Sequence, residues 1–246
     1  MLDPALNDRV ALVTGASGGI GRAIARGLAA EGAAVACGYG ANGEPAQRLA
    51  AEIVDGGGRA VALGADLRDA AAGEALVART RSELGEIDVL VNNAGLGSRR
   101  TWEETTLDEF DEAYAVNVRA AFALAQLTLP GMRDRGFGRV LMMSSVAGLT
   151  GGIVGPHYAA AKSALHGLTH FLAGRLAGAG VTVNALAPAL VKDTGMLPGD
   201  PGELARRIPV GRLGRPGEVA DLALAVLRNG YITSQVISVD GGMYPH

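Results

Sequence analysis

The sequence alternates short apolar runs with longer stretches of helical periodicity, and this pattern limits the fold more than any other feature. Continuous apolar runs are typical of strands buried on both faces, and helices between them indicate a parallel sheet covered on both sides. We therefore expect a single α/β domain built on a doubly wound, seven-stranded parallel sheet. The seven expected strands are Val10–Thr14, Ala33–Cys37, Ala60–Leu63, Val89–Val91, Val140–Met143, Val181–Leu186 and Val236–Val239.

The length of 246 residues suits one such domain. We expect residues 1–8 to form an N-terminal tail and residues 9–246 to form the domain. Within it, residues 190–216 are rich in proline and glycine and are a candidate substrate lid.

Composition excludes several classes of function. A net charge of −3 with 4% aromatic residues provides neither a basic footprint nor a stacking surface for nucleic acid. The single cysteine, Cys37, excludes an internal disulfide, and the four histidines lack the acidic or thiol partners of a metal site. No apolar run approaches the roughly 20 residues of a membrane span. We expect a soluble, cytoplasmic protein with no metal, nucleic acid or membrane partner.

A glycine-rich turn follows the first expected strand and leads directly into the expected helix Ile20–Ala30. Glycine allows a sharp turn, close approach of the backbone to a diphosphate, and close packing of helix on sheet. The turn lacks the Gly-Lys-Ser/Thr sequence of nucleoside-triphosphate hydrolases. It therefore predicts a dinucleotide site that uses Gly15, Ser17, Gly18, Gly19, Ile20 and Gly21.

Tyr158 and Lys162 are four residues apart on an expected helix, so both side chains lie on one face. A nearby ammonium group favours the phenolate, so we expect Lys162 to lower the pKa of Tyr158. Ser145 lies thirteen residues before the tyrosine, just after an expected strand. The adjacent Ser144 is a competing candidate, although the spacing favours Ser145. Asn93 follows a neighbouring strand at the same sheet edge.

The motifs in chain order are Gly15-x3-Gly19-x-Gly21, Asp66-Leu67, Asn92-Asn-Ala-Gly95, Asn117, Ser145, Tyr158-x3-Lys162, and Asn184 followed by Pro188. In this order and spacing they resemble the short-chain dehydrogenase/reductase family, from about Arg9 to Tyr244. Within that family the chain is most similar to the 3-oxoacyl-(acyl-carrier-protein) reductases, whose C-terminal part resembles residues 212–219, 231–235 and 239–244.

The resemblance implies a role for each catalytic residue. Tyr158 would be the general acid in reduction, and Lys162 would lower its pKa and hold the nicotinamide ribose. Ser145 would donate a hydrogen bond to the carbonyl oxygen that becomes an alkoxide. Asn117 would hold a water that links Lys162 to solvent.

The resemblance also implies a set of cofactor contacts. Asp66 and Leu67 would flank the adenine, Asn93, Ala94 and Gly95 would line the ribose and nicotinamide side, and Pro188 and Val191 would touch the nicotinamide. The family's carboxamide-binding threonine corresponds here to Asp193, with Thr194 next to it. Either the loop has shifted by one residue or Thr194 replaces it, and the sequence leaves both open.

Carrier-protein reductases of this type often have two arginines near the site entrance. The corresponding positions here are Ala179 and Gly136, and the neighbouring Arg135, Arg139 and Arg175 are candidates to replace them. The same side chains are equally well explained as solvated charges at helix ends. The resemblance therefore supports the prediction of reductase chemistry better than it supports the prediction of a carrier-bound substrate.

Cofactor choice depends on the end of the second strand. Enzymes that prefer NAD commonly have an acidic residue there, and the equivalent residue is Tyr39, so we expect NADP(H) to be preferred over NAD(H). The expected activity is NADPH-dependent reduction of a 3-oxoacyl thioester or similar ketone. An NAD(P)-dependent alcohol or sugar dehydrogenase and a nucleotide sensor without turnover remain alternatives. The helices at residues 113–132 and 158–176 are apolar all round, so their outer faces need cover. The resemblance implies a homotetramer, because similar proteins pair these helices across one two-fold axis and their last strands across another.

Overall fold

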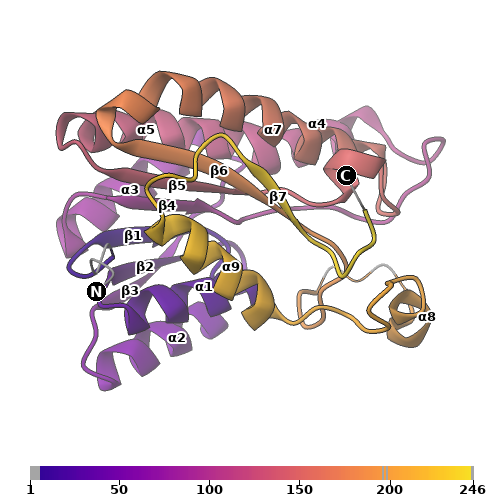
Figure 1. The fold of residues 1–246 in the computed structure, drawn as a ribbon, viewed down its shortest axis with the longest axis horizontal. Helices are drawn as coiled ribbons and strands as arrows, with labels where there is room; N and C mark the ends of the chain where they lie inside the picture. Colours follow the sequence, from indigo (N-terminus) through magenta and orange to yellow (C-terminus); the bar gives the residue numbers. More distant parts are fainter. Residues whose placement is uncertain (1–5, 196, 198, 245–246) are drawn as a thin grey trace.

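The structure is a computed structural model that describes residues 6–195, 197 and 199–244. Within these residues seven parallel strands form one sheet in the order β3-β2-β1-β4-β5-β6-β7, which confirms the expected doubly wound architecture (Figure 1). The strands are β1 Val10–Val13, β2 Ala34–Tyr39, β3 Ala60–Gly64, β4 Val89–Asn92, β5 Gly138–Met143, β6 Val181–Pro188 and β7 Val236–Val239.

The helices alternate with the strands along the chain. They are α1 Gly19–Ala30, α2 Glu44–Asp55, α3 Ala70–Leu84, α4 Leu107–Tyr114, α5 Ala120–Asp134, α6 Ala147–Thr150, α7 Pro156–Leu176, α8 Pro201–Ala205 and α9 Pro216–Arg228. A π-helical turn, Ala115–Arg119, joins α4 to α5, and a 3-10 turn, Ala177–Ala179, follows α7.

The sheet has a helical layer on each face. Helices α1, α2 and α9 cover one face, and α3, α4, α5 and α7 cover the other (Figure 1). Alternate residues of β1 point into opposite layers, with Val13 packed on the α1 side and Leu12 on the α5 side. Both side chains are fully buried, which explains why this strand is continuously apolar.

Strands β2 and β6 each extend two residues further at the carboxyl end than the sequence predicts. Strand β2 continues to Tyr39 because Gly38 and Tyr39 pair with Leu63 and Gly64 of β3. Strand β6 continues to Pro188, which pairs with Val239 of β7. Both extensions occur at the carboxyl ends of the strands, so they lengthen the edge at which ligands bind in such sheets.

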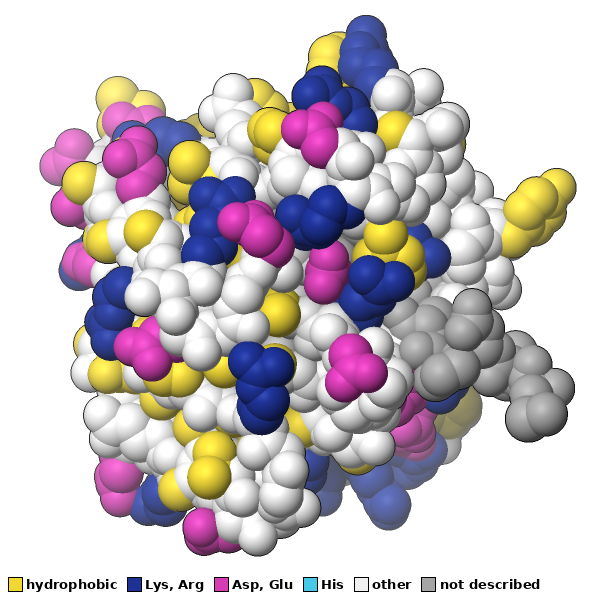
Figure 2. Space-filling view, turned by 90° about the vertical axis from the view of Figure 1, so that its left-hand side faces the viewer, with side chains coloured by type: hydrophobic (Ala, Val, Ile, Leu, Met, Phe, Trp, Pro, Cys, Tyr) yellow, Lys and Arg dark blue, Asp and Glu magenta, His cyan; other side chains and the backbone are white. Residues whose placement is uncertain are grey.

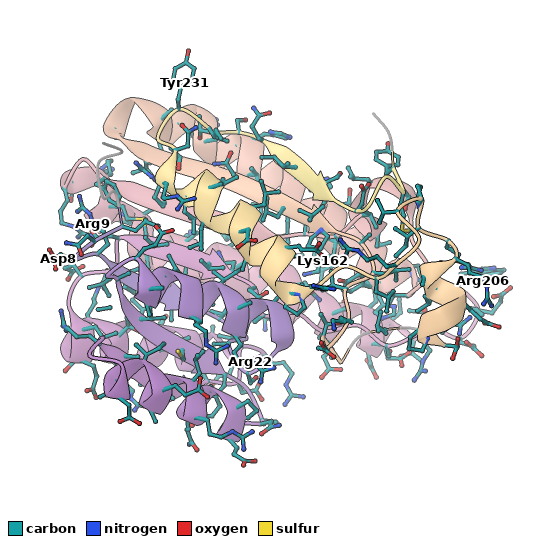
Figure 3. All side chains as sticks on the ribbon, turned by 60° about the horizontal axis from the view of Figure 1, so that its bottom comes forward. Asp8, Arg9, Arg22, Lys162, Arg206 and Tyr231 are labelled. Carbon is teal, nitrogen blue, oxygen red and sulfur yellow. The ribbon has the colours of Figure 1, made fainter. Side chains whose placement is uncertain are left out.

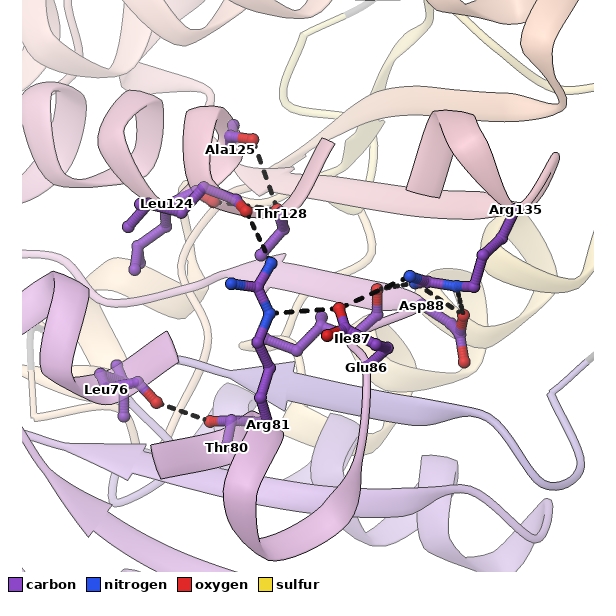
Figure 4. Close-up of polar contacts among 11 residues, drawn as sticks. Leu76, Thr80, Arg81, Glu86, Ile87, Asp88, Leu124, Ala125, Thr128 and Arg135 are labelled. Atoms are coloured by element: carbon purple, nitrogen blue, oxygen red, sulfur yellow. Dashed lines mark hydrogen bonds and ion pairs between the residues drawn. The ribbon is translucent and has the colours of Figure 1, made fainter. Parts of the chain in front are cut away.

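Polar contacts hold the opposite, amino-terminal edge of the sheet. Arg135 donates to Asp88 Oδ1 at 3.1 Å and to the Ile87 carbonyl at 2.7 Å, while Arg81 donates to Glu86 at 3.2 Å (Figure 4). The face of the molecule on this side carries interspersed basic and acidic side chains (Figure 2). These contacts tie the chain before β4 to the end of α5.

Leu6 is 1% exposed and belongs to the core on the α1 side. Of the expected N-terminal tail, residues 1–5 lie outside the described residues. In the part of the chain that the structure describes, no helix is both long and apolar enough to span a membrane.

Candidate active site

The turn between β1 and α1 is packed too tightly for side chains at its glycine positions. A Cβ atom on Gly21 would lie 2.4 Å from the Gly15 carbonyl oxygen, and one on Gly19 would lie 2.3 Å from the Asp193 carbonyl oxygen. Gly15 has a φ of +66° and lies against Ala94. Helix α1 begins after Gly18 without a side-chain cap, so no capping side chain takes up its first N–H groups. Its first residues, Gly19, Ile20 and Gly21, line the cavity beside the turn.

Asn93 fastens this turn to the end of β4. Its side-chain amide donates to the carbonyl oxygens of Thr14 at 2.9 Å and Gly15 at 3.1 Å, and its backbone N–H donates to Thr14 Oγ1 at 3.0 Å. Asn93 therefore fixes the shape of the glycine-rich turn as well as lining the cavity beside it.

A cavity of about 440 Å³ opens at the carboxyl ends of β1, β4, β5 and β6. Fifteen of the residues predicted for the site line it: Gly15, Ser17, Gly18, Gly19, Ile20, Gly21, Asn93, Ala94, Gly95, Ser145, Tyr158, Lys162, Pro188, Val191 and Thr194. The structure thus joins the glycine-rich turn to the expected catalytic residues, which come from segments far apart in the sequence.

Ser145 and Tyr158 meet in this cavity, where the Ser145 side chain is the polar group that acts on the Tyr158 phenol. Burial raises the pKa of the Tyr158 phenol, and the contact with Ser145 only partly offsets that rise. The net shift of the Tyr158 pKa in the described structure is therefore upward, whereas the sequence predicted a fall. Tyr158 is 9% exposed, and this burial disfavours the charged phenolate.

Lys162 is almost completely buried on the same face of α7. Its Nζ donates to the Met143 carbonyl oxygen at 2.8 Å and lies 5.5 Å from the centre of the Tyr158 ring. Burial lowers the pKa of Lys162 to about 8. Because that value lies above neutrality, the side chain is mostly an ammonium ion at pH 7.

The two adjacent serines face different surroundings. Ser144 Oγ donates to the Lys162 carbonyl oxygen at 2.9 Å and lies 2.7 Å from His166 Nε2, so it ties β5 to α7. Ser145 Oγ instead reaches Tyr158 and accepts from the Ala147 N–H at 3.1 Å. The structure thus favours Ser145 for the role in which the sequence left two candidates.

Asn117 lies in the π-helical turn between α4 and α5, and this turn directs its side chain inward. The amide nitrogen donates to the carbonyl oxygens of Leu96 at 2.7 Å and Ala113 at 2.8 Å. A Cβ on Gly95 would lie 2.9 Å from Asn117 Oδ1 and 3.1 Å from Lys162 Nζ. Asn117 is therefore beside the lysine, as expected, and its amide hydrogens are taken up by backbone carbonyls.

A second cavity of about 450 Å³ lies beyond the glycine-rich turn, at the ends of β2 and β3. The predicted Tyr39, Asp66 and Leu67 line it, as do Arg68 and Glu112, which sequence analysis missed. Arg68 donates to Asp66 at 2.6 Å and to Glu112 at 2.9 Å. That pairing lowers the pKa of Asp66 to about 2.

The structure also separates Asp193 from Thr194. Thr194 lines the first cavity, with its hydroxyl donating to the Val191 carbonyl at 3.0 Å. The Asp193 side chain is exposed, with its carboxylate 3.8 Å from Lys192 Nζ, while its backbone packs on Gly19. Of the two residues, only Thr194 is among the described residues that line this cavity.

None of the three arginines considered for the site entrance lines either cavity. Arg135 pairs with Asp88 at the amino-terminal edge, Arg139 is buried against the Leu227 carbonyl, and Arg175 stacks on Phe171. Arg135 and Arg175 precede β5 and β6, and Arg139 is the second residue of β5, so all three lie toward the edge of the sheet opposite the cavity.

A different arginine, Arg207, lines the first cavity together with Ile153, Val154, Leu197 and Met243. No spacing rule in the sequence indicated it, because it reaches the cavity only through the path of the segment after β6. His157 is 2% exposed, and its ring nitrogens have no hydrogen-bond partner in the part of the chain described. It packs against Gly155, outside the cavity.

A glycine cradle at the point where the strand order reverses, beside a buried tyrosine and lysine, defines a nicotinamide-dependent oxidoreductase. A family model described as short chain dehydrogenase matches residues 9–201. The chain belongs to the short-chain dehydrogenase family.

Its relatives include named reductases. The chain is 37% identical to a 3-oxoacyl-[acyl-carrier-protein] reductase of Synechocystis sp., covering 97% of this chain and 98% of the relative. It is 38% identical to an acetoacetyl-CoA reductase of Rhizobium meliloti, covering 96% and 98%. A solved short-chain dehydrogenase/reductase from Serratia marcescens superimposes with a TM-score of 0.91 at 37% identity, covering 97% of this chain and 99% of that one.

Proposed function

We propose that this protein is a ketoreductase that reduces a 3-oxoacyl thioester or a similar ketone to a secondary alcohol, preferring NADPH. The observation that carries the proposal is the contact of the Ser145 and Tyr158 hydroxyls beside Lys162, in a cavity continuous with the glycine-rich turn. Two neighbouring hydroxyl groups at a cavity wall suit a carbonyl oxygen that gains negative charge.

Each of the buried residues has a separate role in the proposed reduction. The raised pKa of Tyr158 keeps its phenol protonated at neutral pH, so it can give a proton to the substrate oxygen. Ser145 donates a second hydrogen bond to that oxygen. The ammonium group of Lys162 stabilises the phenolate left behind and holds ribose hydroxyls. Asn117 anchors the loop after β4 through the Leu96 carbonyl beside Lys162. It also holds the water that reprotonates the lysine.

The glycine-rich turn fits a dinucleotide because its N–H groups and open backbone accept a diphosphate that a Cβ would exclude. A bound reduced nicotinamide would supply the hydride. Gly15, Gly19 and Gly21 would hold the diphosphate, Asp66 and Leu67 the adenine, and Pro188, Val191 and Thr194 the nicotinamide. The absence of a carboxylate at Tyr39 removes the group that would repel a 2′-phosphate.

We also infer a homotetramer. Phe122 on α5 and Phe171 on α7 are 36% and 53% exposed, so the outer faces of these helices present aromatic side chains to solvent. Pairing of these faces about a two-fold axis would cover them.

A panel of carbonyl substrates tests the proposed activity. Acetoacetyl thioesters, simple ketones and polyols are each assayed with NADPH, NADH and the oxidised cofactors, and the absorbance of the reduced nicotinamide is followed. Reduction of 3-oxoacyl thioesters with NADPH supports the proposal. Faster oxidation of polyols would indicate an alcohol or sugar dehydrogenase, and tight cofactor binding without any turnover would indicate a sensor.

A further inference from the structure

Arg207 gives the cavity a charge that the proposed chemistry does not use. Among the described residues that line the cavity, only Lys162 and Arg207 carry a formal charge, and both are positive. Lys162 already has a role beside Tyr158, and its ammonium donates a hydrogen bond to the Met143 carbonyl. Arg207 lies instead with apolar residues, including Ile153 and Met243.

The backbone on both sides of Arg207 is anchored. Its N–H donates to the Leu204 carbonyl at 3.1 Å, and Leu204 and Ile208 are buried on either side of it. Further along, the Val210 N–H donates to the Gly241 carbonyl at 3.2 Å. The path of the chain therefore brings Arg207 to the cavity, while the preceding Arg206 points outward (Figure 3).

The guanidinium of Arg207 has no hydrogen-bond or ion-pair partner within the described residues. Two other arginines, by contrast, are paired with carboxylates: Arg212 contacts Glu218 at 2.6 Å, and Arg68 contacts Asp66 at 2.6 Å. An unpaired guanidinium at an apolar cavity wall retains its capacity to bind an anionic oxygen group in two-point fashion.

We infer that Arg207 binds an anionic group of the substrate and selects charged ketones over neutral ones. This inference rests on the proposed ketoreductase function. The substrate would place its carbonyl oxygen at Ser145 and Tyr158, its short apolar part against Ile153, and a carboxylate or phosphate at Arg207. No carboxylate of the described residues lines the cavity to oppose that charge.

Four ketones with the same acetoacetyl group test this inference. Acetoacetate carries a carboxylate, the 4′-phosphopantetheine thioester carries a phosphate, and ethyl acetoacetate and the N-acetylcysteamine thioester are neutral. Wild-type protein is compared with Arg207→Gln, with Arg207→Lys, and with Arg206→Gln as the matched control on the adjacent, outward-pointing side chain.

We expect Arg207→Gln to lower kcat/KM at least about ten-fold for an anionic ketone, mainly through KM, and to change the neutral ketones less than about two-fold. Arg207→Lys should restore part of the loss, and Arg206→Gln should have no effect. A loss confined to acetoacetate identifies a carboxylate substrate, and a loss confined to the phosphopantetheine thioester identifies a phosphate.

An equal loss on charged and neutral ketones, no loss at all, or the same loss in Arg206→Gln overturns the inference. If wild-type protein reduces none of the ketones, the proposed function fails, and Arg207 is tested by binding instead. Calorimetric titration of cofactor-loaded protein with 3-hydroxybutyrate and its ethyl ester then shows whether Arg207 binds the anionic group. Weaker binding of the charged ligand alone in Arg207→Gln supports the role, and unchanged or absent binding overturns it.

Discussion

The Nζ atom of Lys162 donates a hydrogen bond to the carbonyl oxygen of Met143, 2.8 Å away. The last residue of β5 thus holds a side chain of α7 at the base of the cavity. A carbonyl oxygen compensates a buried ammonium less than a carboxylate does, so burial lowers the lysine pKa to about 8. The position of this ammonium is set by the protein backbone.

This pKa can be measured directly, because the chain contains only two lysines, Lys162 and Lys192. In protein labelled with ¹³C-lysine, we expect the Lys162 side-chain signal to titrate with a midpoint near 8, with exposed Lys192 as the internal reference. An unfolded lysine holds its proton to about 10.4, so Lys162 should make the free energy of unfolding rise with pH between these values. A midpoint at or above about 10 would contradict the burial argument.

Tyr158→Phe should remove nearly all turnover and leave cofactor affinity within a few-fold. The ring still packs, while the proton donor is lost, and one general acid contributes about 10²–10⁴-fold. Single-turnover rates and cofactor titration by fluorescence provide the measurement. A variant that keeps more than about a tenth of the wild-type rate would exclude Tyr158 as the acid.

Gly21→Ala should weaken cofactor binding at least about ten-fold and destabilise the protein by about 1–3 kcal/mol. The added Cβ would lie 2.4 Å from the Gly15 carbonyl oxygen and 2.5 Å from Asn93 Nδ2, so the turn must shift. Gly18→Ala is the matched control, since its Cβ would lie 3.4 Å from the same oxygen. Calorimetric affinity and urea unfolding should separate the two variants; equal values would show that the turn adapts freely.

Wild-type protein should prefer NADPH over NADH by about ten- to thirty-fold in kcat/KM, and Tyr39→Asp should reverse that preference. The new carboxylate would repel a 2′-phosphate and bind ribose hydroxyls. Tyr39→Phe is the control, because it retains the ring that packs on Gly43 and Gly64 and adds no charge. Equal use of both cofactors by wild type, with no response to Tyr39→Asp, would show that this turn does not set the choice.

Light scattering at micromolar concentration should give the mass of a tetramer. Phe122→Glu and Phe171→Glu would each place a charge on an exposed helix face and should lower the mass. Arg26→Glu, on the outward side of α1, is a control for added charge. A monomer alone in the wild-type sample would reject the tetramer.

Local patterns in the sequence determined much of the architecture. Apolar runs buried on both faces, such as β1, define strands without reference to distant residues, and the glycine-rich turn and the four-residue spacing of Tyr158 and Lys162 are equally local. From these features the sequence predicted the doubly wound sheet, the edge of the sheet that carries the site, and fifteen of the residues that line the first cavity.

Tertiary structure decided what depends on burial and on contacts between distant segments. It raised the pKa of Tyr158 where the sequence predicted a fall, because desolvation is a property of the assembled core. It placed Ser144 against α7 and left Ser145 at the tyrosine. It also brought Thr194 and Arg207 to the cavity, since their places follow from how the chain after β6 packs on α1 and on the residues after β7.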